Sequence, residues 1–155
     1  MDSNTFKKKI LRLFIYICLI NSIFSFINNQ KGLLSKSSFI TMRFNVTGSV
    51  EILNSGFEPK PDKLYINDTQ LSEYTNKITI NDIKEIIKIE WNDDKVITSC
   101  KEMFYDSINV TVIDMSRFNS SLVTDMAYMF RHCVRLTSIN LNGFSTSLVT
   151  TKKSY

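Results

Sequence analysis

The sequence is poor in the residues that most catalytic and metal-binding motifs require. It contains four glycines, two prolines, three cysteines and one histidine among 155 residues. It has no glycine-rich loop that would cradle phosphates and no Gly-x-Ser-x-Gly motif. A serine nucleophile needs a positioned histidine, and zinc needs three or four ligands at defined spacing. The neighbours His132 and Cys133 do not supply either set. We therefore expect that the protein is not an enzyme and that it binds no metal and no cofactor. We also expect His132 to be exposed.

A large excess of one charge is also missing. The net charge is +4 at pH 7, and part of it lies in residues 7–9 and Arg12, ahead of any folded domain. This modest excess gives no electrostatic argument for binding nucleic acid.

The longest hydrophobic run is short for a membrane span. It covers residues 13–27, about 15 residues where roughly 20 are needed. Basic residues precede the run and small polar residues end it, so residues 1–27 are predicted to be a helical secretory signal cut near Ser25. An uncleaved membrane anchor and a buried helix are the alternatives. Only the anchor would give the protein a membrane contact. Polar residues 28–38 are predicted to be a linker.

Residues 39–99 have the pattern of a small β-rich domain. Short apolar and β-branched runs are separated by Gly, Pro and Asn turn signals, at residues 39–46, 50–53, 64–66, 78–80 and 87–91. Asn81 and Asp82 could instead cap a helical turn that leads into the last of these runs, although its alternation favours a strand. Because this segment directly precedes a repeat array, we expect it to be the N-terminal cap.

Residues 100–155 contain an internal repeat. Residues 103–124 and 129–150 match with an offset of about 26, within the window of about 20–29 residues for leucine-rich repeats. Residues 136–141 predict a short strand, and residues 145–147 a polar connection. Met126, Met129, Phe130 and Cys133 recur at helical spacing, with Asp125 placed to cap a helix. Each unit is therefore predicted to be a strand, a turn and a short helix.

The motif itself carries a family resemblance. Residues 118–133 read Phe-Asn-Ser-Ser-Leu-Val-Thr-Asp-Met-Ala-Tyr-Met-Phe-Arg-His-Cys. This resembles the repeat of the BspA-like leucine-rich repeat surface proteins, approximately Phe-Asp-Thr-Ser-Asn-Val-Thr-Asp-Met-Ser-x-Met-Phe. That family overlaps a repeat first described as a mycoplasma protein domain of unknown function. This chain has Asn119-Ser120 where Asp-Thr is usual, and about two repeats where relatives carry many. The resemblance implies extracellular or cell-surface binding and adhesion, without naming a ligand.

Together these patterns predict an α+β fold: a signal helix, a β-rich cap and a short leucine-rich-repeat solenoid. Strand positions not used by the core are predicted to form a ligand-binding face. Its members are Thr111, Asp114, Ser116, Thr137, Ser138, Asn140 and Asn142.

Two kinds of covalent modification depend on secretion. Sequons place candidate N-glycosylation sites at Asn45, Asn67, Asn109 and Asn119. Cys100 and Cys133 remain after signal cleavage and could form a disulfide in an oxidising compartment. The alternative is that each is a small apolar packing residue.

The functional expectation is a secreted or cell-surface recognition protein of the adhesion type, with an extracellular protein or glycan as ligand. The main alternative is a truncated or decayed fragment of a longer repeat protein. In that case the uncapped last repeat would favour self-association, because arrays generally need a polar cap at each end.

Overall fold

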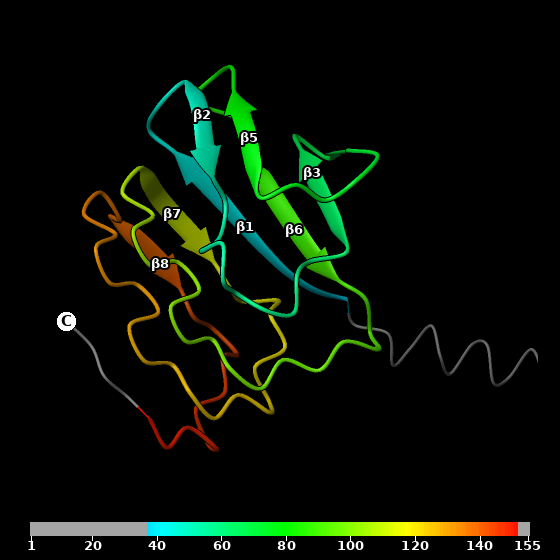
Figure 1. The fold of residues 1–155 in the computed structure, drawn as a ribbon, viewed down its shortest axis with the longest axis vertical. Coiled ribbons are helices and arrows are strands. Elements are labelled where there is room, and N and C mark those ends of the chain that lie inside the picture. The colour runs from blue at the N-terminus through cyan, green and yellow to red at the C-terminus, as the bar shows by residue number, and fades with distance from the viewer. Residues whose placement is uncertain (1–36, 152–155) are drawn as a thin grey trace, which may run out of the picture. The chain divides into compact units, whose positions relative to one another are not determined.

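A six-stranded mixed sheet is the centre of the fold in the computed structural model, which describes residues 37–151 (Figure 1). Its strands run in the order β4-β3-β6-β1-β7-β8, and β2 and β5 form a separate two-stranded sheet. The strands are β1 (Ser38–Phe44), β2 (Gly48–Glu51), β3 (Lys63–Ile66), β4 (Thr69–Gln70), β5 (Lys77–Ile80), β6 (Ile87–Trp91), β7 (Val110–Asp114) and β8 (Ser138–Asn140). The strands expected between residues 39 and 99 are present, and β6 settles the choice between helix and strand there.

Strand β1 joins the N-terminal part to the repeats. Its residues alternate, so that Ile40, Met42 and Phe44 are buried on one face. It pairs antiparallel with β6 on one side and with β7 on the other. The predicted cap and the first repeat therefore share one continuous sheet.

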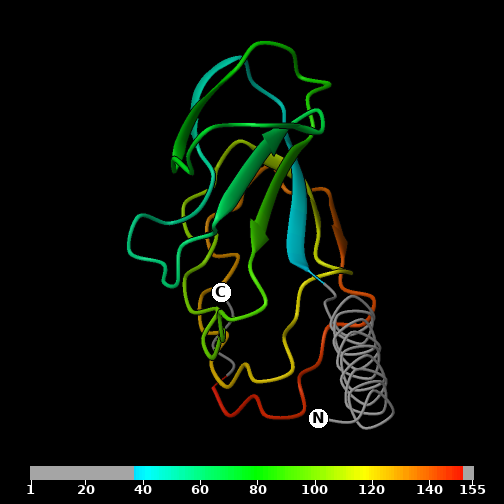
Figure 2. The ribbon, with the colours of Figure 1, turned by 90° about the vertical axis from the view of Figure 1, so that its right-hand side faces the viewer.

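The repeat is present as stacked coils. Strands β7 and β8 pair in parallel, with Asp114 opposite Asn140, and isolated parallel bridges join Ser99, Asp125 and Thr151. We call residues 99–124 coil 1 and residues 125–150 coil 2. Successive coils, coloured from yellow-green to red, lie side by side in Figures 1 and 2.

The predicted short helices are wrong. No helix occurs within residues 37–151, and the segments with helical spacing are series of tight turns. Glu102, Asp106, Tyr128 and His132 have positive φ, between 55° and 62°, which is incompatible with a right-handed helix. The backbone of these segments forms hydrogen bonds with the neighbouring coil instead.

The backbone hydrogen bonds show why turns replace helices. In coil 1, alternate N–H groups donate to coil 2, as in Glu102 N–H to the Ala127 carbonyl (2.9 Å) and Phe104 N–H to Met129 (2.9 Å). The intervening groups close i to i+3 turns, as in Met103 N–H to Cys100 (3.2 Å). Asp125, expected as a helix cap, accepts from the Ala127 N–H (2.8 Å) and so closes a local turn.

The α+β class is therefore replaced by an all-β fold for the described residues. The predicted signal segment 1–27 and most of the linker 28–38 lie outside the described part. Within residues 37–151, no helix is long and apolar enough to cross a membrane.

Aromatic rings connect the sheet to the coils. Trp91 is fully buried and meets Phe57 and Phe118 edge-on, with ring centroids 6.4 and 5.5 Å away. Phe118 stacks on its repeat equivalent Phe144 at 6.0 Å. The Phe104–Phe130 pair repeats this arrangement at 5.7 Å. The Met and Phe positions of the repeat are thus packing positions.

Candidate binding site

The structure brings the predicted strand face together, but most of its polar groups already bond to the protein. Asp114 accepts from the Ser116 N–H (2.8 Å) and from the Asn140 side-chain amide (3.1 Å). Asn140 accepts from the Asn142 N–H at 3.1 Å, which repeats the Asp114 turn one coil later. These side chains close the turns that end β7 and β8.

The threonines of this face are used in the same way. Thr137 donates its hydroxyl to the Thr111 carbonyl (3.1 Å), and Thr111 donates to Arg43 (3.3 Å). Ser138 and Asn142 are exposed, whereas Ser116 is half-buried. The strand face therefore contributes mainly to the stability of the stack and is a weaker candidate for ligand binding.

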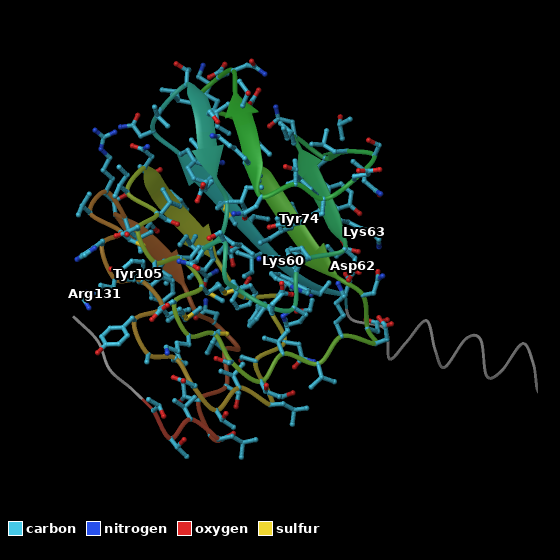
Figure 3. All side chains as sticks on the ribbon, in the orientation of Figure 1. Lys60, Asp62, Lys63, Tyr74, Tyr105 and Arg131 are labelled. Carbon is cyan, nitrogen blue, oxygen red and sulfur yellow. The ribbon has the colours of Figure 1, made fainter. Side chains whose placement is uncertain are left out.

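A cluster of aromatic and charged side chains lies where the turn series stack. His132 Nδ1 is 2.6 Å from Asp106 Oδ1, and the Tyr105 ring lies 5.4 Å from the His132 ring. The Arg131 guanidinium lies 5.9 Å from the Tyr105 ring and 5.2 Å from the Tyr128 ring. Figure 3 shows Tyr105 and Arg131 together on the coils. His132 is exposed, as expected, but it has a specific partner that the sequence did not indicate.

This cluster borders an open cleft of about 310 Å³. Three parts of the chain line it: the end of β1, β2 with the loop after it, and the turn that leads into β7. The lining residues are Phe44, Ser49, Val50, Glu51, Leu53, Asn54, Ser55, Tyr105, Asp106, Ser107, Ile108 and Asn109. Phe44, Val50 and Leu53 are buried and form an apolar floor, and the walls are mainly polar.

Internal contacts hold several of the polar groups of the cleft. Asp106 contacts His132, Asn54 accepts from the Gly56 N–H (2.9 Å), and Asn109 accepts from Arg135 (3.2 Å). A site whose polar groups are fixed before binding loses less conformational entropy when a ligand arrives. This cleft is therefore the strongest candidate binding site in the described part of the chain.

A second cavity of about 350 Å³ also has Asn54 in its lining. Gly56, Phe57, Glu58, Ser99, Lys101 and Glu102 complete its lining. It lacks the aromatic and histidine cluster that borders the first cleft, so we give it less weight.

A charged network elsewhere is structural. Lys95 lies 2.8 Å from Asp62 and donates to the Lys60 carbonyl (2.6 Å), while Lys63 lies 2.7 Å from Glu90. Burial raises the pKa of Asp62, but bonds from the Asn92 N–H and Lys95 outweigh burial and lower the pKa overall. Figure 3 places Lys60, Asp62 and Lys63 away from Tyr105. These contacts hold the loop before β3 against the end of β6.

Cys100 and Cys133, the two cysteines among residues 37–151, are free thiols. Burial raises the pKa of Cys100 to about 12 and that of Cys133 to about 11. The Cys133 thiol donates to the Phe104 carbonyl at 3.1 Å. Both thiols are therefore protonated at neutral pH, as the packing alternative expects of small apolar residues.

The four sequon asparagines lie in different settings. Asn45, Asn67 and Asn119 are exposed, and Asn109 is half-buried in the cleft wall. Glycosylation at all four stays a prediction. No group of three or more His, Cys, Asp or Glu side chains in residues 37–151 is arranged to hold a metal ion.

Fold and site together define an all-β protein of stacked repeat coils with an open polar cleft at their side. One family model matches the chain, over the repeats and strands β4, β5 and β6 before them. The chain belongs to the family described as Mycoplasma protein of unknown function, DUF285, whose model matches residues 69–155. No curated protein and no solved structure is a match to this chain.

Proposed function

We propose that this chain is a non-catalytic recognition protein that is secreted or displayed at the cell surface. The observation that carries the proposal is the cleft, where two distant parts of the chain supply fixed polar groups around an apolar floor. Polar groups held in place beside an apolar surface can orient a ligand and give specificity.

The resemblance to BspA-like surface proteins supports the same proposal. In such proteins the repeated motif is associated with binding and adhesion outside the cell. The predicted signal at residues 1–27 adds a route to that location.

The test is to express the full chain with a C-terminal tag in a secretory host, then determine the mature N-terminus and screen for binding. We expect cleavage near Ser25, release or surface display, and saturable binding to extracellular glycoproteins. An unprocessed chain that stays in the cytosol and binds none of them would overturn the proposal.

A further inference from the structure

We propose that the cleft beside Tyr105 binds a neutral saccharide, through one sugar ring at the end of a glycan. This inference rests on the proposed recognition function and names its ligand class. It begins from the hydrogen-bonding character of the lining. The walls carry hydroxyl, amide and carboxylate groups, mainly from Ser49, Glu51, Asn54, Asp106 and Asn109.

These side chains match the groups of a sugar. A sugar ring presents hydroxyls that donate to carboxylate and amide oxygens and accept from amide N–H groups. The apolar C–H face of the same ring needs apolar surface, which Tyr105 and the exposed Ile108 supply at the cleft. The volume lies at the lower end of the range for ligand pockets, roughly 300 to 1,000 Å³, which suits a single ring.

The charges around the cleft favour a neutral ligand. Of the two carboxylates of the lining, Glu51 lies opposite Lys77 in the β2–β5 pairing, and Asp106 contacts the His132 ring. At the rim, Arg135 donates to Asn109. A second rim arginine, Arg131, lies over the Tyr105 ring.

These rim cations disfavour a polybasic peptide, and the two carboxylates of the lining disfavour an acidic sugar. A ligand that offers hydroxyls without a net charge is repelled neither by the arginines nor by the carboxylates. Its hydroxyls can still use the carboxylates as strong acceptors.

The experiment is saturation-transfer NMR on the full chain with methyl glucoside, methyl galactoside and methyl mannoside as probes. Glucuronic acid and pentalysine are tested in parallel. We expect at least one neutral glycoside to bind more tightly than glucuronic acid. Glu51→Gln should weaken that binding about tenfold by removing a charged acceptor. Glu73→Gln changes an exposed acid outside the cleft and should leave it unchanged.

A second variant protects the test from a folding artefact. Ser49→Tyr fills the cleft from an exposed strand position and should abolish binding while the protein spectrum stays native. Absence of neutral glycoside binding, or binding that Glu51→Gln and Ser49→Tyr leave unchanged, would overturn the inference. Tighter binding of pentalysine or glucuronic acid would overturn it too. Secretion with saturable glycoprotein binding that Ser49→Tyr leaves intact would preserve the proposed function while rejecting the saccharide site.

Discussion

At the scale of single residues, Trp91 has the largest structural role. Its ring is fully buried between Phe57 and Phe118, and its indole N–H donates to the Pro59 carbonyl at 2.8 Å. Trp91→Ala should lower the free energy of unfolding by about 3–5 kcal/mol, because it leaves a large cavity. Denaturant titration measures the change. Ile83→Ala, at a half-exposed position, is the control, with an expected loss of about 1 kcal/mol or less.

We expect the stability of the stack to depend on pH through Asp114. Its pKa is lowered first by the hydrogen bond from the Ser116 side chain; burial opposes this, and bonds from the Ser116 N–H and Asn140 add to the lowering. A carboxyl whose folded pKa is lowered stabilises the fold above its unfolded pKa, about 3.9 for aspartate. That contribution is lost as the pH falls through the folded pKa.

We therefore expect Asp114→Asn to be less stable than the native chain at pH 7, and the difference to shrink below about pH 4. Urea unfolding at both pH values measures it. A constant difference would show that the charge of Asp114 has no part in the effect. Asp68→Asn, at an exposed turn, is the matched control.

At the scale of elements, one glycine substitution distinguishes a turn from a helix by the sign of its effect on the free energy of unfolding. Glu102 has φ of 55°, where a side chain is strained and glycine is not. Glu102→Gly should raise the free energy of unfolding by up to about 1 kcal/mol relative to Glu102→Ala. In a helix the same exchange would cost about 1 kcal/mol. Thermal unfolding of the two variants decides between these outcomes. A glycine variant less stable than the alanine variant would indicate a helix at this position and contradict the turn.

The sequence predicted the repeat and most strands, but not the shape of the repeat unit. The period follows from the apolar positions, which recur because equivalent side chains stack, as Phe118 does on Phe144. The spacing of Met126, Met129 and Phe130 suits a helical face and also suits consecutive tight turns. What decides between them is the bonding of backbone N–H groups to the next coil, a long-range contact that local spacing does not contain.

The cleft was not predicted for a related reason. Glu51 and Asp106 reach it from segments far apart in the chain, and the pairing of β1 with β7 brings those segments together. The polar residues at the repeated strand positions were easier to find. Several of them, such as Asp114 and Asn140, are there to close turns.

At the scale of the whole molecule, the stack is buried unevenly. In coil 1, Ile113 and Met115 are fully buried, whereas their equivalents in coil 2, Ile139 and Leu141, are 38% and 39% exposed. Hydrophobic stabilisation follows the apolar area removed from water, so coil 2 is held less tightly than coil 1. We expect backbone amides of β8 to exchange with solvent faster than those of β1 and β7, which hydrogen-exchange mass spectrometry resolves by segment.

The equivalent positions also allow a test by paired mutations. Ile113→Ala should lower the free energy of unfolding by about 2–5 kcal/mol, because it leaves a cavity under the sheet. Ile139→Ala should lower it by about 1–2 kcal/mol, because its side chain is already partly hydrated. Leu122→Ala and Leu148→Ala form the control pair, since these equivalent leucines are 49% and 47% exposed and should cost the same. Equal losses at Ile113 and Ile139 would mean that something covers coil 2 in solution as fully as coil 2 covers coil 1. A loss at Ile139 that grows with protein concentration would identify that cover as a second copy of the chain.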